Sequence, residues 1–181
     1  MRLLLGIIFF IITLFFYTNN FAEDAPDAPV FTLTTNAFLD TGALPVLYTC
    51  DGKDNSPQFS WSNPPAKTKS YVFLVTDPEA PNGTFYHWIV YNIPAATTEL
   101  AEGVTTFPPN TQIGKNSKGE KKYNGPCPPK GSTHDYHFAL YALDASLKLP
   151  EGAEGKTVED NIKNHILQKV EITAVYSRWL K

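Results

Sequence analysis

The chain has 181 residues, a formal net charge of −3, 43% hydrophobic residues and 18% charged residues. This composition excludes a disordered tail and a coiled coil, and a mildly acidic chain without a basic run argues against a nucleic-acid partner. Fifteen prolines and eleven glycines are spread along the sequence, which is typical of short strands joined by many turns and not of long helical bundles.

The N-terminus has the pattern of a secretory signal peptide. Arg2 supplies a positive charge, an apolar run from Leu3 to Phe16 follows, and Ala22 offers a small residue for cleavage. A helix of ~14 residues extends only ~21 Å, which is short of the ~30 Å hydrocarbon core of a membrane. We therefore expect a signal peptide over residues 1–22, an exported protein that is periplasmic or secreted, and no stable membrane span after cleavage. An uncleaved N-terminal anchor is the alternative.

After a polar, proline-rich lead-in over residues 23–30, one domain is expected over 31–181. Phe31–Thr35 alternates apolar and polar residues, as a half-buried strand does. The segment between Thr97 and Lys122 is polar and predicts a surface excursion with short strands. Four further strands are expected, the first three apolar enough to be covered on both faces: Tyr71–Val75, Trp88–Ile93, Tyr136–Leu143 and Val170–Tyr176.

A single helix is predicted near the C-terminus. Thr157 is expected to cap it, with Asp160 completing a pattern like a capping box. Its apolar face would contain four residues at helical spacing: Val158, Ile162, His165 and Ile166. The elements together predict a mainly β fold, a sandwich or barrel-like core with a helix packed at its edge.

Two cysteines, Cys50 and Cys127, lie in turn-rich segments of the exported part. In an oxidising compartment they can form one disulfide that closes a loop of about 77 residues and contributes roughly 4 kcal/mol in the chain-entropy model. The alternative is two free thiols that never approach each other.

Acidic and imidazole side chains stand at the ends of the three apolar strands. Asp77-Pro78-Glu79-Ala80-Pro81 follows the first strand, and its prolines fix φ and remove backbone donors. His87 lies at the start of the second strand, and His134 precedes the third. Each feature alone is compatible with a solvated turn or a satisfied core histidine, but their recurrence at three strand ends favours a shared cleft.

Six motifs occur in one order along the chain: Tyr48-Thr49-Cys50-Asp51-Gly52, Ser56-Pro57-Gln58-Phe59-Ser60-Trp61, Asp77-Pro78-Glu79-Ala80-Pro81, His87-Trp88, Gly125-Pro126-Cys127-Pro128-Pro129 and His134-Asp135-Tyr136-His137-Phe138. Together they resemble the phosphatidylethanolamine-binding protein (PEBP) family, in particular its bacterial Raf-kinase-inhibitor-like branch. The resemblance spans about residues 31–176. It implies a PEBP-like β-sandwich with a large central antiparallel sheet and a peripheral C-terminal helix.

The resemblance also implies a small pocket for phosphate or a phospholipid head group, with no cofactor and no metal. A histidine near Asp77 is expected to take its charged form, which favours an anionic ligand. Two positions depart from the family: Glu79 stands in place of a second Asp, and Asp135 replaces a basic residue. The ligand-binding residues implied are Asp77, Glu79, Tyr86 at the rim, His87, Gly125, Cys127, Pro128, His134 and Tyr136.

The predicted function is that of an exported, non-catalytic binding protein that holds a phosphoryl group or modulates a partner protein. Inhibition of kinases or proteases is the activity associated with the family, and a secreted protease or a host protein is easier for an exported chain to reach than a cytoplasmic kinase.

Two other functions remain open. One is a hydrolase in which Ser132 or Thr133 acts beside His134, with Asp77 and His87 as base and orienter. The other is a metal site that draws on the same acids and histidines and on Cys127, although no His-x-x-x-His or Cys-x-x-Cys spacing occurs. His137 and His165 are expected to be packing residues.

Overall fold

The computed structural model describes residues 29–179, so the predicted signal peptide and most of the predicted lead-in lie outside the described residues. Among the described residues, no helix is long and apolar enough to span a membrane. The elements follow one another as β1 (Thr32–Thr34), β2 (Gly42–Ala43), the 3-10 turn η1 (Val46–Tyr48), β3 (Phe59–Ser62), β4 (Ser70–Asp77), β5 (Phe85–Pro94), β6 (Glu99–Leu100), β7 (Gln112–Ile113), β8 (Thr133–Leu143), α1 (Gly155–Ile162) and β9 (Ile166–Ser177).

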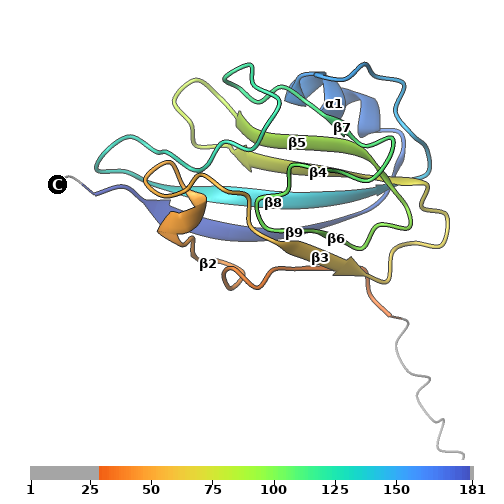
Figure 1. Cartoon of the computed structure of the whole chain (residues 1–181), viewed down its shortest axis with the longest axis horizontal. Coiled ribbons are helices and arrows are strands. Elements are labelled where there is room, and N and C mark those ends of the chain that lie inside the picture. Colours follow the sequence, from red (N-terminus) through yellow and green to blue (C-terminus); the bar gives the residue numbers. More distant parts are fainter. Residues whose placement is uncertain (1–28, 180–181) are drawn as a thin grey trace, which may run out of the picture.

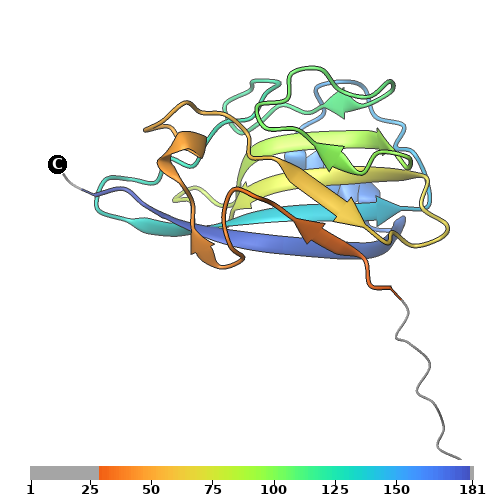
Figure 2. The same cartoon turned by 60° about the horizontal axis from the view of Figure 1, so that its bottom comes forward.

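The strands form two sheets that pack face to face. The large sheet has the order β2-β9-β8-β4-β5-β7, and the small sheet has the order β1-β3-β6. Figure 1 shows the long strands of the large sheet running along the molecule, and Figure 2 shows the small sheet in front of them. The sandwich prediction is confirmed, with one difference: the outermost pair, β2 and β9, is parallel, whereas the other neighbours in the large sheet are antiparallel.

Aromatic side chains fill the space between the two sheets. Phe59 and Trp61 of β3 and Tyr71 and Phe73 of β4 are almost completely buried there. The rings of Phe59 and Phe73 lie 4.7 Å apart between their centroids, and those of Trp61 and Tyr71 lie 5.4 Å apart. Aromatic pairs at these separations add to the stabilisation from burial alone, so this cluster fixes the small sheet on the large one.

A second apolar cluster covers the opposite face of the large sheet. Val72 and Leu74 of β4 point to this side, and Val158 and Ile162 of α1 pack in the same cluster. Because successive strand residues point to opposite faces, the unbroken apolar run of β4 is explained by burial on both sides. The helix therefore covers part of the outer face of the large sheet, and the prediction of a peripheral C-terminal helix is confirmed.

The helix begins two residues before the predicted cap. Its N-cap is Glu154, without a side-chain capping bond, and Thr157 lies inside the helix. A Cβ on Gly155 would lie 2.2 Å from the ring of Tyr86, so only glycine permits this close approach of the helix to β5. The chain leaves the helix after Ile162, and Ile166 already belongs to β9, so the predicted apolar face over His165 and Ile166 is wrong.

The predicted strands are confirmed with somewhat different ends. β4, β5, β8 and β9 each extend beyond the apolar run that predicted them, because the backbone hydrogen bonds of the sheet continue past that run. The segment between Thr97 and Lys122 contains β6 and β7, each two residues long, which agrees with the expected surface excursion.

Cys50 and Cys127 form a disulfide, which decides between the two alternatives left open by the sequence. Their Cα atoms lie 5.4 Å apart, and the sequence separation is 77 residues. The bond joins the loop after η1 to the proline-rich segment before β8, two segments that share no strand pairing.

Opening this disulfide is expected to lower the free energy of unfolding by about 4 kcal/mol, because the unfolded chain then regains the freedom that a closed loop of this length removes. The measurement is urea unfolding of the oxidised protein and of a Cys50→Ser/Cys127→Ser variant. Equal urea midpoints with equal m-values would contradict the expectation.

Candidate ligand-binding site

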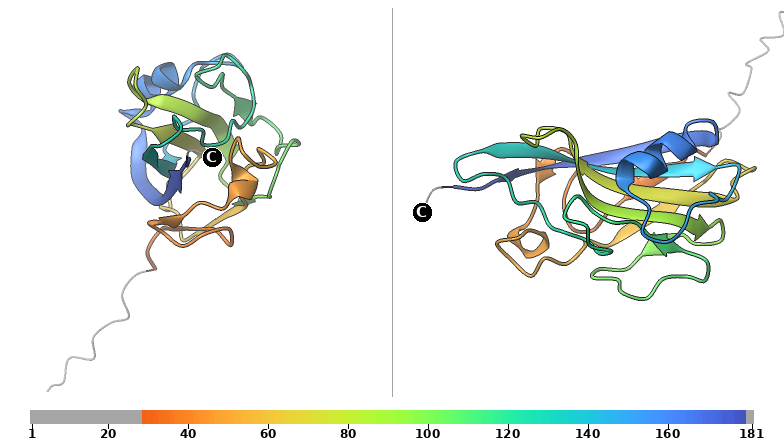
Figure 3. Two further views of the ribbon diagram at one scale, coloured as in Figure 1. Left: turned by 90° about the vertical axis from the view of Figure 1, so that its left-hand side faces the viewer. Right: turned by 90° about the horizontal axis from the view of Figure 1, so that it is seen from above.

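Four strand ends meet at the end of the large sheet near the C-terminus. β4 ends there and β5 begins there, with Asp77 paired with Phe85. β8 also begins there, and Thr133 pairs with Ser177 at the end of β9. The left-hand view of Figure 3 looks onto this end of the molecule. Antiparallel pairing thus brings together side chains from segments that lie far apart in the sequence.

A cavity of about 310 Å³ opens at this end of the sheet. Of the nine predicted ligand-binding residues, five line it: Asp77, His87, Cys127, Pro128 and His134. The other lining residues are Ala80, Pro81, Phe85, Lys118, Asn124, Pro129 and Arg178. The predicted acid and both imidazoles therefore share one cavity.

Asp77 and His134 form a buried pair in the cavity wall. The Nδ1–H of His134 donates to Oδ2 of Asp77 at 2.7 Å, and the backbone N–H of Glu79 donates to Oδ1 at 2.8 Å. Asp77 is 4% exposed and His134 is 8% exposed. These two donors replace the hydrogen bonds to water that the carboxylate loses on burial. The Nδ1 of His134 is used in this pair, so Nε2 is the ring nitrogen that remains for a ligand.

His87 is also buried, but it is held differently. Its Nδ1 lies 2.6 Å from the backbone oxygen of Asn124, and because a carbonyl only accepts, Nδ1 carries the proton and Nε2 keeps a lone pair. Burial lowers the pKa of His87 to about 4, although the Asn124 carbonyl and Asp77 act in the opposite direction. The expectation of a charged histidine beside Asp77 is therefore wrong for His87, because desolvation outweighs the carboxylate.

Tyr136 packs behind the two imidazoles and does not line the cavity. Its ring centroid lies 5.3 Å from that of His87 and 6.4 Å from that of His134. Its hydroxyl is buried without a hydrogen-bond partner among the described residues. Burial raises the pKa of Tyr136, and the negative charges of Asp77 and Glu79 raise it further. The phenol is therefore a neutral donor at the back of the site.

Three other predicted residues lie outside the cavity lining. Tyr86 follows Phe85 on β5 and points to the opposite face, where its hydroxyl donates to Glu159 at 2.5 Å, so its expected place at the rim is wrong. Gly125 is buried, its N–H donates to Asp54, and a Cβ there would lie 2.6 Å from that carboxylate. Glu79 is exposed, and its Oε2 accepts from the backbone N–H of Asp135 at 2.6 Å.

Two cations at the cavity were missed by the sequence analysis. Arg178 follows the last residue of β9, and its Nε lies 3.2 Å from Oδ1 of Asp51. Lys118 belongs to the surface excursion and is close enough to act on the pKa of His87. No local pattern in the sequence pointed to either residue, because the pairing of β8 with β9 that brings Arg178 to the cavity joins remote segments.

The residues of the alternative functions are engaged elsewhere. The hydroxyl of Ser132 donates to the backbone oxygen of Pro129, and that of Thr133 lies 2.8 Å from the hydroxyl of Ser177. Cys127 is in a disulfide, and no group of three or more metal-ligating side chains gathers among residues 29–179. His137 and His165 were expected to be packing residues, but both lie at the surface beside a carboxylate. His137 pairs with Glu171, and His165 pairs with Asp144.

The fold is a β-sandwich with a small cavity at one end of its large sheet, where an acid, two imidazoles and two cations meet apolar walls. A family model described as phosphatidylethanolamine-binding protein matches residues 34–177. The chain belongs to this family, and family membership supports a binding-protein kind of function.

Relatives from bacteria agree with this assignment. The chain is 41% identical to a UPF0098 protein of Aquifex aeolicus over 88% of this chain and 95% of that protein. A crystal structure of a putative PEBP homologue from Chlamydia trachomatis has a TM-score of 0.75 and 35% identity, covering 82% of this chain and 97% of its own. The crystal structure of E. coli YbcL, described as a new member of the mammalian PEBP family, has a TM-score of 0.78 and 32% identity. The match covers 83% of this chain and 99% of YbcL.

The burial of His87 predicts a specific pH dependence of stability. The folded pKa of about 4 lies below the ordinary value of 6.5, so the unfolded chain binds the proton more readily. The contribution of His87 is fully present above pH 6.5 and is lost as the pH falls towards 4, at about 1.4 kcal/mol per pH unit and about 3 kcal/mol in total.

The measurement combines an NMR titration of the His87 ring with urea unfolding between pH 4 and 7. The amide of a His87→Asn variant can donate to the Asn124 carbonyl but does not titrate. Its free energy of unfolding should therefore fall less steeply between pH 6.5 and 4 than that of the unchanged protein. A His87 ring that protonates near pH 6.5 would contradict the assignment of a neutral imidazole.

Proposed function

We propose that this protein is an exported, non-catalytic binding protein whose cavity takes a small phosphoryl group, either free phosphate or a phosphorylated head group. The observation that carries the proposal is the presence of Lys118 and Arg178 together with His134 at a cavity of about 310 Å³. Such a volume suits a head group and not a whole lipid, and the cations supply the attraction for its negative charge.

The polar atoms of the cavity match the oxygens of a phosphoryl group. Arg178 has five N–H donors, of which Nε is directed to Asp51. Lys118 adds an exposed ammonium group at the lining, and His134 adds Nε2, which donates when both ring nitrogens carry a proton. The neutral His87 offers a lone pair on Nε2, which accepts from a protonated phosphate oxygen or from the ammonium group of phosphoethanolamine.

The remaining walls strengthen these contacts. Pro81, Phe85, Pro128 and Pro129 line the cavity without adding charge. Apolar walls keep water away and lower the local dielectric constant, so each charge-assisted hydrogen bond contributes more than it would at an open surface. Asp77 is already paired with His134 and the Glu79 N–H, which reduces its repulsion of an anion.

Export and a protein partner belong to the same proposal. The signal-like leader and a disulfide between two segments that share no strand pairing both suit an oxidising compartment. The family resemblance supports modulation of a partner such as a protease, a kinase or a host protein, with the cavity rim as the contact.

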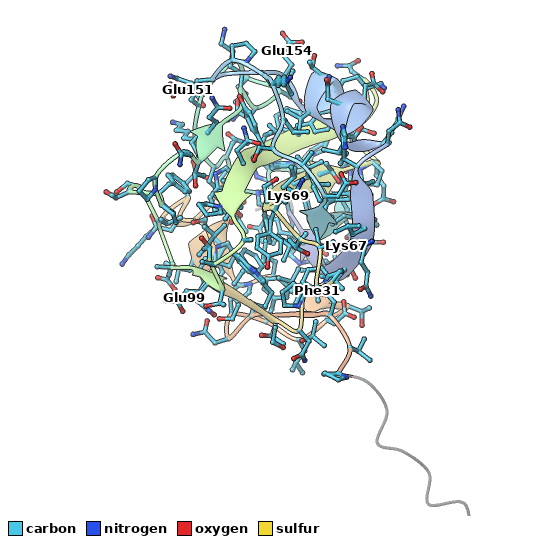
Figure 4. The ribbon with its side chains drawn as sticks, turned by 90° about the vertical axis from the view of Figure 1, so that its right-hand side faces the viewer. Phe31, Lys67, Lys69, Glu99, Glu151 and Glu154 are labelled. Atoms are coloured by element: carbon cyan, nitrogen blue, oxygen red, sulfur yellow. A yellow bond between two sulfur atoms is a disulfide. The ribbon has the colours of Figure 1, made fainter. Side chains whose placement is uncertain are left out.

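Titration with inorganic phosphate and with phosphoethanolamine is expected to shift the ring signals of His87 and His134 in NMR spectra, with a Kd between micromolar and millimolar. Lys118→Gln is expected to weaken binding about fivefold, because an exposed cation contributes about 1 kcal/mol. The matched control is Lys67→Gln, since Lys67 is exposed at the opposite end of the molecule (Figure 4) and should leave Kd unchanged.

Two results would overturn the pocket assignment. One is the absence of shifts at both rings with tens of millimolar ligand. The other is equal weakening by Lys118→Gln and Lys67→Gln, which would indicate an unspecific effect of net charge.

Export has its own test. When the full-length chain is expressed in a bacterium, the mature protein is expected in the periplasm or the medium with Glu23 as its first residue, as measured by intact mass after fractionation. A cytoplasmic protein that retains residues 1–22 would contradict the prediction.

A further inference from the structure

We infer that the Cys50–Cys127 disulfide is a redox-sensitive element of the cavity, so that its reduction by a dithiol weakens binding of the phosphoryl ligand. The inference rests on the proposed function, because it concerns the affinity of that same cavity. Four features of the structure carry it: the position of Cys127, the chemistry of the wall that contains it, the loop at the other end of the bond and the accessibility of that bond.

Cys127 is itself part of the cavity wall. It lines the cavity together with Pro128 and Pro129, which follow it directly in the chain. The disulfide therefore attaches one continuous piece of the wall to the loop that carries Cys50. A covalent bond within the lining of a binding site has a direct effect on the shape of that site, which a bond elsewhere in the core would not have.

This wall can donate few backbone hydrogen bonds of its own. Between residues 126 and 129, three of the four residues are prolines and have no backbone N–H to donate. The wall takes part in two backbone hydrogen bonds as acceptor, from Cys50 N–H to the oxygen of Pro126 and from Ser132 N–H to that of Pro129, each 3.1 Å. One of these two bonds comes from Cys50, and the hydroxyl of Ser132 adds a contact to the oxygen of Pro129. Just before the wall, the N–H of Gly125 donates to Asp54. The disulfide is therefore the one covalent link between the wall and a loop that it also meets through hydrogen bonds.

The other end of the disulfide holds a cation of the cavity. Asp51 follows Cys50 and binds Nε of Arg178 at 3.2 Å from Oδ1 and 3.1 Å from Oδ2. Its Oδ2 also accepts from the hydroxyl of Tyr176 at 2.8 Å. The loop that carries Cys50 thus positions Arg178, while the disulfide connects this loop to the proline-rich wall. Opening the bond removes the covalent link between these two parts of the cavity and leaves only hydrogen bonds between them.

The bond is accessible to a reductant. Cys127 is exposed and Cys50 is partly exposed. A thiolate of the dithiol attacks one cysteine sulfur and the other cysteine leaves as a thiolate; the second thiol of the reagent then resolves the mixed disulfide. Two electrons pass to the protein, which gains two thiols, and the reagent becomes a cyclic disulfide.

Reduction is expected to weaken binding because the wall then populates its binding-competent position for only part of the time. If this fraction falls to about one tenth, the apparent Kd rises about tenfold. Thermodynamic reciprocity then requires that saturating ligand favours the disulfide by the same factor. A tenfold change corresponds to about 30 mV in the potential of a two-electron couple.

The experiment measures the Kd of phosphoethanolamine by NMR titration for the oxidised protein and for the same protein in excess dithiothreitol. The expected result is a Kd about tenfold higher after reduction, with the amide signals of β4 and β8 retained. In redox buffers of dithiothreitol and its cyclic disulfide, saturating phosphoethanolamine is expected to raise the oxidised-to-reduced ratio about tenfold. The Cys50→Ser/Cys127→Ser variant serves as the matched control: its Kd should equal that of the reduced protein and should not respond to dithiothreitol.

Three outcomes would overturn the inference. Equal affinities of the folded oxidised and reduced proteins would show that the disulfide does not act on the cavity. Loss of the β4 and β8 amide signals on reduction would show that the bond supports the whole fold and not the wall. Failure of the oxidised protein to bind phosphoethanolamine or inorganic phosphate would overturn the proposed function itself, which the first two outcomes leave intact.

Discussion

The burial of β4 on both faces is the constraint on which the arrangement of this protein depends. Tyr71 and Phe73 pack towards the small sheet, and Val72 and Leu74 pack towards α1, so no position in the middle of the strand can hold a charged side chain without a large desolvation cost. Polar chemistry is therefore confined to the strand ends. Because the neighbours of β4 are antiparallel to it, the end that carries Asp77 lies beside the beginnings of β5 and β8, where His87 and His134 stand.

Within the site, the two imidazoles differ because their partners differ. The Nδ1 of His134 is directed to a carboxylate, whereas that of His87 is directed to a neutral carbonyl. Burial then dominates for His87 and lowers its pKa to about 4. A cavity with one neutral imidazole, one imidazole paired with an acid and two cations at its lining can supply both donors and an acceptor to a single ligand. A phosphoryl group needs donors for its oxygens, and its protonated oxygen or attached ammonium group needs an acceptor.

The proline-rich segment before β8 is locally stiff but can donate few backbone hydrogen bonds. Each proline fixes its own φ but gives up a donor, so the segment keeps its shape locally while depending on other contacts for its position. The disulfide to Cys50 supplies such a contact across 77 residues of sequence. The same bond that restricts the unfolded chain thus also locates the wall of the cavity relative to Asp51 and Arg178.

Patterns in the sequence predicted β1, β4, β5, β8 and β9 and five of the cavity residues, but they did not predict β2 or β3. Continuous apolar runs reveal doubly buried strands, and acids or histidines at their ends reveal a site, because both signals are local in the chain. The sequence also suggested Tyr86 as a rim residue, but its side chain points to the opposite face, since neighbouring residues in a strand alternate in direction. The folded arrangement alone reveals the pairing of Cys50 with Cys127, the neutral state of His87, and the position of Lys118 and Arg178 at the cavity. These depend on distances between remote segments and on the depth of burial, which no local pattern of residues records.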